Sequence, residues 1–392
     1  MREYLNNPDR LAILRQLIPI LREADAEFGE DQFNELALQI FRYQFERCGP
    51  FRKLVEALGC SAQVVDYREI PAVPTDAFKL YRMACFDPRA GEIEFHTSGT
   101  TNGKSGIHVL PTPNLYNAAA MRWFGKHIFP ENERGASGEM PERMKPLRFI
   151  SLTGAPSEMP HSSLVHMIGM AGRLFSGKVP DREAGGETCS PAVDYFYKNQ
   201  TLESERMVSA LADCIRRGEA ALIFTTAFAL VHFLEALEMD GMTLELAEGS
   251  RIMETGGYKG RARNLDRDEL YEWASELIGV PTRQIVNEYG MTEMSSQFYD
   301  RTLSNAELEE ADARIKLSPP WVRSMVIDPV TRNEVAEGEI GILRHVDLAN
   351  LDSCAFLQTA DAARKVGAGF ELLGRLEEAE QRGCSLDYEE SE

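Results

Sequence analysis

The sequence has few basic residues for its length. Its 392 residues include 42 Lys and Arg against 62 Asp and Glu, and the formal net charge is -20. Proteins that bind nucleic acid present a basic surface to the phosphate backbone, and this chain has no basic stripe. Nucleic acid is therefore not an expected partner, and any nucleotide bound by the chain is expected to be a small ligand.

Long apolar runs are also missing. The most apolar stretch, residues 220–234, is interrupted by Thr225, Thr226 and His232, and it is shorter than the roughly 20 residues of a transmembrane helix. The N-terminal segment mixes charged and apolar residues without the pattern of a secretory signal. These features predict a cytoplasmic protein with no transmembrane segment.

Paired cysteines are absent as well. The seven cysteines include no C-x-x-C pair, and an odd number without that spacing favours neither a disulfide framework nor a zinc site. We expect reduced thiols, most of them acting as small core residues. The length of the chain allows a large core and more than one subdomain.

The most informative motif is HTSGTTNGKSGIH at residues 96–108, where ten of thirteen residues are Gly, Ser, Thr, Lys or Asn. Glycines let the backbone approach an anion, hydroxyls donate hydrogen bonds and Lys104 supplies positive charge, so the motif predicts a phosphate loop. A Walker A loop has four residues before its Gly-Lys pair. Here only three separate Gly99 from Gly103, and Pro111 and Pro113 prevent a helix from following at once. The plain alternative is a surface turn rich in Ser and Thr.

The pattern along the chain indicates an α/β fold. Apolar residues recur at helical spacing from Phe33 to Phe45, and the CGP sequence at 48–50 ends that helix. Helical patterns at 227–237 and 266–277 follow predicted strands, which indicates βαβ units and a parallel sheet. From about Trp321 the pattern changes to antiparallel hairpins. The predicted strands lie in the segments LRFISLTGAPS, ALIFTTAF, RIMETGGYKG and RQIVNEYGMTE.

Ligands bind beyond the carboxyl ends of parallel strands. The turns TGG at 255–257 and EYGMTE at 288–293 follow two such strands. We therefore expect these turns to face the same crevice as the phosphate loop.

Five motifs occur in an order that resembles the acyl-adenylate-forming enzymes, the superfamily of acyl-CoA synthetases, luciferases and peptide-synthetase adenylation domains. They are TSGTT at 97–101, EYGMTE at 288–293, GEIGIL at 338–343, TAD at 359–361 and GR at 374–375. Further segments resemble one branch, the acyl-protein synthetases of bacterial luminescence. Those segments are IPAVPTDAFK at 70–79, HSSLVHMIG at 161–169, METGGYKGR at 253–261, EYGMTEMSSQFY at 288–299 and RGCSL at 382–386.

The resemblance covers about residues 30–390 and implies a large adenylate-forming domain over 1–374 with a short tail over 375–392. Within the large domain it implies a helical part at about 1–60, a nucleotide-binding α/β core at about 90–300 and a small β part at about 320–374. The chain ends 17 residues after Arg375. The mobile C-terminal domain that carries the adenylation lysine in most relatives is therefore expected to be truncated or absent.

The resemblance also implies ATP and Mg²⁺ as cofactors and assigns site residues. Lys104 and Thr292 are implied in catalysis, with Thr292 bonded to the α-phosphate, and Glu293 is implied as the Mg²⁺ ligand. Asp361 is implied to bind the ribose, with Arg375 nearby. The β- and γ-phosphates are assigned to Thr97, Ser98, Gly99, Thr100, Thr101 and Gly103, and the adenine to Gly256, Gly257, Tyr289 and Gly290.

Several of these residues have a plain alternative. Tyr289 fits equally well as a buried aromatic of the core. Glu293 fits as an acid at the start of a helix, and Asp361 fits as an N-cap for the segment that follows it. The loop also departs from the superfamily pattern, with Asn102 in place of Gly and Lys104 one position early.

The acyl acceptor is implied by the same resemblance. A mixed anhydride is readily attacked by a thiolate, and the branch passes its acyl group through a cysteine near the C-terminus, which here is Cys384. The leading hypothesis is ATP-dependent formation of acyl-AMP from a carboxylic acid, followed by a cysteine thioester released to a reductase or another acceptor. Transfer to coenzyme A or a carrier protein is one alternative, and a catalytically silent subunit that binds nucleotide or acyl ligand is another.

The length of the acyl group is not predicted. Phe224, Phe228, Leu230, Phe233 and the segment 161–170 are candidates for an acyl tunnel, but apolar residues at this spacing are more typical of a plain core.

Overall fold

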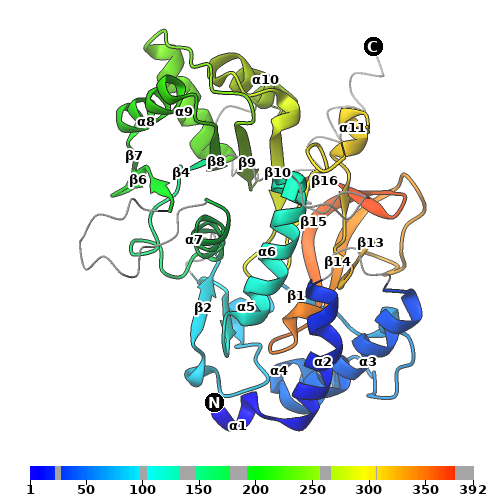
Figure 1. Ribbon diagram of the computed structural model, residues 1–392. Helices are drawn as coiled ribbons and strands as arrows, with labels where there is room; N and C mark the ends of the chain where they lie inside the picture. The colour runs from blue at the N-terminus through cyan, green and yellow to red at the C-terminus, as the bar shows by residue number, and fades with distance from the viewer. Residues whose placement is uncertain are drawn as a thin grey trace. The chain divides into compact units, whose positions relative to one another are not determined.

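The computed structural model describes residues 1–22, 28–97, 104–132, 147–176, 192–256, 266–305 and 307–375 (Figure 1). The chain forms two compact units. Unit 1 comprises Met1–Trp123, Met291–Phe298 and Ile315–Glu392. Unit 2 comprises Phe124–Gly290 and Tyr299–Arg314. Each unit therefore draws on separate stretches of the sequence.

Unit 1 begins with helices, as the sequence predicts. In α3 the apolar side chains at helical spacing, including Phe33, Leu36 and Phe41, are buried. This helix ends at Cys48 in an extended conformation, and Pro50 lies in the first turn of the next helix, where its missing N–H costs nothing. The helices are α1 (Arg2–Leu5), α2 (Pro8–Arg22), α3 (Glu30–Arg47) and α4 (Gly49–Ala57).

The main sheet of unit 1 is antiparallel, with strand order β12-β16-β15-β14-β13 (orange to red in Figure 1). The predicted hairpin is confirmed, because Ile327 of β13 pairs with Ile342 of β14. A short strand, β1, joins the sheet in parallel beside β15, where Val73 pairs with Leu357. The strands are β1 (Val73–Pro74), β12 (Lys316–Leu317), β13 (Val322–Ile327), β14 (Ile340–Asp347), β15 (Phe356–Val366) and β16 (Gly369–Arg375).

Unit 1 also contains the hairpin that carries the phosphate loop. β2 (Ile93–His96) and β3 (Ile107–Leu110) pair antiparallel, with His96 opposite Ile107. The loop is thus followed by a strand and not by a helix, as its prolines predict. α5 (Ala77–Leu80) packs on this hairpin through the ring of Phe78, and α6 (Asn114–Ile128) begins after Pro113.

Unit 2 is built on the predicted parallel sheet, with strand order β11-β10-β9-β8-β4-β5. β4 pairs with β8, β8 with β9 and β9 with β10, each time in parallel. Each of these strands lies in one of the four segments predicted from the sequence. The strands are β4 (Arg148–Ser151), β5 (Asp194–Tyr195), β8 (Ala221–Thr226), β9 (Arg251–Thr255), β10 (Ile285–Tyr289) and β11 (Phe298–Tyr299); β6 (Tyr197–Lys198) and β7 (Thr201–Leu202) form a separate pair.

The helices of unit 2 begin and end at capping residues. Thr226 accepts a hydrogen bond from Ala229 N at the start of α9, and Asp266 forms a capping box with Glu269 at the start of α10. Gly279 ends α10 in the left-handed conformation. The helices are α7 (Ser163–Phe175), α8 (Ser204–Arg217), α9 (Ala227–Met239), α10 (Arg267–Ile278) and α11 (Glu310–Ala313).

The core of unit 2 includes three of the residues considered for an acyl tunnel. Leu230 and Phe233 belong to the cluster that α8, α9 and α10 form against the sheet. Phe224 is fully buried, stacks on Phe124 and packs at a tilt against Phe149. These side chains are core residues, whereas Phe228 is 40% exposed.

Four cysteines, Cys48, Cys85, Cys214 and Cys354, are buried as small core residues, and Cys60 is half-buried. Cys189 and Cys384 lie outside the described residues. Among the helices that the structure describes, none combines the length and apolar character needed to cross a membrane.

Candidate functional site

The base of the phosphate loop is closed by backbone and side-chain hydrogen bonds in unit 1. Thr97 N donates to the Gly106 carbonyl over 3.0 Å, and Gly106 N donates to Thr97 Oγ1 over 2.8 Å. A Cβ on Gly106 would lie 3.1 Å from Thr97 Cγ2 and 3.5 Å from Phe78 Cβ. Glycine is therefore needed here because the two ends of the loop approach closely, and Thr97 fixes the loop with its acceptor lone pair while its hydroxyl hydrogen stays available as a donor.

The described part of the phosphate loop comprises Thr97 and the residues from Lys104 onward. Lys104 is exposed and directly precedes the closed base. The assigned residues Ser98, Gly99, Thr100, Thr101 and Gly103 lie outside the described residues, and so do Gly257 and Cys384.

Thr292 lies beside the two strands of unit 1 that flank the phosphate loop, and Glu293 follows it. His108 Nδ1 on β3 lies 2.8 Å from the Thr292 carbonyl, and Thr292 Oγ1 points toward the His96 carbonyl over a long 3.5 Å. Asn350 Nδ2 donates to the Glu293 carbonyl over 2.8 Å. The EYGMTE turn and the phosphate-loop hairpin are thereby tied together.

A buried polar group holds the residues that follow the EYGMTE turn. Asp347, at the end of β14, accepts hydrogen bonds from Ser295 N over 3.0 Å and from Ser296 Oγ over 2.8 Å. Trp321 Nε1 donates to the same Ser296 Oγ over 2.9 Å. Burial raises the pKa of Asp347 to about 6, against the lowering effect of these hydrogen bonds. The turn is therefore anchored to the β sheet of unit 1.

The carboxyl of Glu293 is buried among both signs of charge. Glu293 is only 7% exposed. Burial raises its pKa to about 7, whereas the charges of Arg375 and Lys79 lower that pKa and the charge of Asp361 raises it. Two cations and a second carboxylate therefore act on this group, and no helix begins at Glu293, so the helix-start interpretation is wrong.

Asp361 and Arg375 pair across neighbouring strands. They face each other in the register of β15 and β16, and Asp361 Oδ1 lies 3.1 Å from Arg375 Nε. Thr359 Oγ1 accepts a hydrogen bond from Asp361 N over 3.1 Å. Asp361 lies within β15, so the N-cap interpretation is wrong, and its side chain is 11% exposed against 62% for Arg375.

Unit 2 holds the residues assigned to the adenine. Gly256 follows β9 with a positive φ of 83°, and Tyr289 and Gly290 lie at the end of β10. The two strands pair in parallel, so these residues share the carboxyl edge of the sheet. Tyr289 is 8% exposed, in agreement with the plain alternative of a buried aromatic.

The sequence reasoning missed two residues beside the turn, Lys79 and His108. Both lie in motifs that the sequence analysis quotes, Lys79 at the end of IPAVPTDAFK and His108 at the end of the phosphate motif. Lys79 follows Phe78, whose ring packs on the His108 imidazole with centroids 5.6 Å apart. Only the fold brings α5 against β3, so spacing along the sequence gives no signal for this contact.

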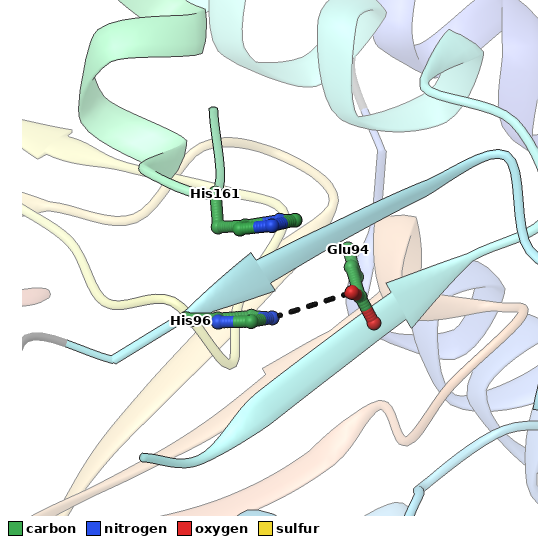
Figure 2. A group of neighbouring side chains, drawn as sticks. All are labelled: Glu94, His96 and His161. Carbon is green, nitrogen blue, oxygen red and sulfur yellow. Dashed lines mark ion pairs between the residues drawn. The ribbon is translucent and has the colours of Figure 1, made fainter. Parts of the chain in front are cut away.

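His96 forms an ion pair with a neighbour on its own strand. Glu94 and His96 are two residues apart on β2 and so lie on one face of it, with Glu94 Oε1 3.5 Å from His96 Nε2 (dashed line in Figure 2). The third side chain drawn in Figure 2, His161, belongs to unit 2. The Glu94–His96 pair stands at the strand end from which the phosphate loop departs.

The motif order, the parallel sheet and the joined loops match one known family. The sequence profile of "Acyl-protein synthetase, LuxE" matches residues 187–391, slightly more than half of the chain. The chain belongs to the acyl-protein synthetase family. It is thus a ligase that forms an acyl adenylate and transfers the acyl group to protein.

Two members of this family show the extent of the likeness. The "Long-chain-fatty-acid--luciferin-component ligase" of Vibrio harveyi is 19% identical over 360 residues, which cover 90% of this chain and 85% of that protein. The protein of the same name from Aliivibrio fischeri is 28% identical over 204 residues, which cover 49% of this chain and 51% of that protein.

Solved structures confirm the adenylate-forming fold of this acyl-protein synthetase. An open conformation of 2-hydroxyisobutyryl-CoA ligase, in complex with 2-HIB-AMP and CoA, superposes with a TM-score of 0.61 at 13% identity. The match covers 90% of this chain and 77% of that one. The postadenylation state of that ligase gives a TM-score of 0.61 at 12% identity, over 91% and 70% of the two chains.

Proposed function

We propose that this acyl-protein synthetase activates a fatty acid with ATP and passes the acyl group through the thiol of Cys384. The observation that carries the proposal is the cluster in unit 1 that joins the phosphate-loop base, Thr292, Glu293 and the Asp361–Arg375 pair. Binding of ATP requires a loop for its phosphates, a carboxyl for the metal ion, here Glu293, and a carboxylate that accepts hydrogen bonds from the ribose hydroxyls, here Asp361. The fatty acid is inferred from the names of the Vibrio and Aliivibrio relatives.

In the first step a carboxylate oxygen of the acid attacks the α-phosphorus of ATP. The bond from that phosphorus to the bridging oxygen of pyrophosphate breaks, so the products are acyl-AMP and pyrophosphate. Thr97, Lys104 and the residues between them hold the leaving phosphates, and Thr292 holds the α-phosphate. Such groups act by position, because they lie ready where negative charge develops.

Glu293 is the residue that would hold Mg²⁺. Its carboxyl is buried, which penalises the charged form, and a divalent cation beside it would offset that penalty. A single carboxylate together with phosphate oxygens is the donor set that Mg²⁺ commonly accepts. When bound, the ion would neutralise charge on the phosphates.

In the second step the thiolate of Cys384 attacks the carbonyl carbon of acyl-AMP. The carbon–oxygen bond to the phosphate breaks, AMP leaves and a thioester remains on the protein. An acceptor protein, such as a reductase or a carrier, then takes the acyl group from this thioester.

The test combines pyrophosphate exchange with acyl labelling. We expect the wild-type protein to exchange pyrophosphate into ATP with fatty acids, in preference to aryl and amino acids, and to lose this activity when EDTA removes Mg²⁺. Radiolabelled fatty acid should label the wild-type protein, and hydroxylamine should release the label. Cys384→Ser should keep the exchange and lose the label, while the control Cys60→Ser keeps both.

Three results would contradict the proposal in different ways. Labelling of Cys384→Ser as strong as that of the wild type would exclude this thiol. Formation of acyl-CoA on addition of coenzyme A, detected by mass, would favour the small thiol as acceptor. A complete lack of acid-dependent pyrophosphate release across the panel would indicate a subunit that binds its ligands without catalysis.

A further inference from the structure

A buried histidine connects the two segments that form the nucleotide site of unit 1. His108 lies on β3, two residues after Gly106 closes the phosphate loop, and its side chain is fully buried. Its Nδ1 lies 2.8 Å from the carbonyl oxygen of Thr292. One short strand thus holds both the loop and the turn that leads to Glu293.

The chemistry of the contact fixes the tautomer of the ring. A carbonyl oxygen can only accept a hydrogen bond, so the hydrogen of the neutral imidazole must lie on Nδ1. Burial lowers the pKa of His108 to about 4, against the raising effect of the hydrogen bond to Thr292. The ring is therefore neutral near pH 7, with a bare lone pair on Nε2, and that atom has no hydrogen-bond partner among the described residues.

The ring is also held from its side. The Phe78 ring packs edge-on against the imidazole, with centroids 5.6 Å apart and an interplanar angle of 82°. Phe78 belongs to α5, which follows directly on β1 and its parallel pairing with β15. The imidazole is thus fixed by a strand and by a helix anchored to the strand that carries Asp361.

We propose that His108 is a positioning residue for adenylation, which holds Thr292 and Glu293 in register with the phosphate loop through its Nδ1–H. The inference rests on the proposed function of the site. A site that is displaced by about 1 Å can lose a factor of about 100 in rate, and a donor on a strand is a rigid way to prevent such a displacement. Direct contact with ATP is not part of this role.

Two substitutions separate the hydrogen bond from the packing of the ring. His108→Phe keeps an aromatic ring against Phe78 but removes the donor, whereas His108→Asn keeps an amide donor close to the position of Nδ1 and removes the ring. His345→Phe is the matched control, because His345 is also fully buried in unit 1 and packs on Phe298 and Phe370. The measurement is pyrophosphate exchange per folded molecule, together with the midpoint of thermal unfolding.

We expect His108→Phe to lower kcat for exchange at least tenfold, with a smaller change in KM for ATP, and His108→Asn to recover most of kcat despite a lower unfolding midpoint. His345→Phe should keep the wild-type rate. The inference is overturned if His108→Phe exchanges pyrophosphate as fast as the wild type, or if the rates of all three variants simply follow their unfolding midpoints. Either result leaves the proposed function intact. If none of the acids tested supports pyrophosphate exchange by the wild-type protein, the proposed function fails, and the inference fails with it.

Discussion

Charge at the proposed nucleotide site is set by individual residues on different elements. Glu293 lies in a turn, Asp361 in β15 and Lys79 in α5, and each affects the same small region of unit 1. Lys79 Nζ also forms an ion pair with Asp76 Oδ1 over 2.6 Å, and its side chain is 26% exposed. The ammonium is therefore partly withdrawn from water, where its charge acts more strongly than at the surface.

Removal of the Lys79 charge should weaken the binding of ATP. We expect Lys79→Met to raise the KM for ATP about tenfold, which corresponds to ~1.4 kcal/mol, because a cation next to Glu293 no longer offsets the negative phosphates. Lys79→Arg should restore most of the affinity. The exposed Lys53 of α4 provides the control, since Lys53→Met removes an equal charge elsewhere in unit 1. Equal KM values for Lys79→Met and the wild type would exclude this role.

At the scale of single residues, sequence patterns predict chemical type better than local conformation. Asp361 is assigned from its motif, yet its place in a strand depends on pairing with β16. Glu293 is likewise assigned from its motif, but its backbone is held by Asn350, which lies 57 positions away in the sequence. No local pattern contains such long-range contacts.

Among the elements, the antiparallel sheet of unit 1 gives a structural reason for one motif. Gly341 is the second glycine of GEIGIL, and a Cβ at this position would lie 2.5 Å from the backbone oxygen of Ile327 on β13. No side-chain movement can relieve a contact with backbone. The glycine is thus required by the close approach of β13 and β14.

A methyl group at this position should destabilise the fold. We expect Gly341→Ala to lower the free energy of unfolding by about 1 to 3 kcal/mol, the usual cost of overpacking. Urea unfolding followed by circular dichroism measures this difference. Ile340→Ala, at an exposed neighbour in the same strand, should cost less than about 1 kcal/mol. A Gly341→Ala protein as stable as the wild type would show that the strands can separate without cost.

The existence and order of the elements follow from the sequence more directly than their pairing. Apolar runs ending in polar or glycine-rich turns locate β4, β8, β9 and β10, because a buried parallel strand needs apolar side chains on both faces. The parallel pairing of β1 with β15 has no such signal. It joins segments nearly three hundred residues apart, and only the completed sheet selects it.

For the whole molecule, buried ionisable groups affect stability against acid. Burial lowers the pKa of His345 to about 3, whereas an unfolded histidine has a pKa of about 6.5. The unfolded chain therefore binds a proton at this residue as the pH falls below 6.5, while the folded protein does not. The contribution of His345 to stability is thus present above pH 6.5 and is lost as the pH falls toward 3.

Replacement of this histidine should change how stability depends on pH. Relative to the wild type, we expect the free energy of unfolding of His345→Phe to increase by about 1 kcal/mol for each pH unit below pH 6. Urea unfolding at pH 7.5, 6.5 and 5.5 tests this expectation. Asp347, with its raised pKa, acts in the opposite direction, but it is present in both proteins and cancels in the comparison. Parallel stability curves for the two proteins would contradict the prediction.

The division into units is the part of the fold that the sequence predicts least. The chain passes from one unit to the other after Trp123, Gly290, Phe298 and Arg314. Linear patterns of apolar residues describe successive elements, and they carry no information about which distant segments share a core. The N-terminal helices and the C-terminal strands are grouped in unit 1 by contacts that form only on folding.

The repeated crossing of the chain between the units limits how this protein can be rebuilt. Since neither unit is a continuous stretch of the gene, neither can be excised with a single pair of cuts or grafted whole onto another enzyme. Recombination at any one of these crossing points would leave unit 1 composed of segments from two parents.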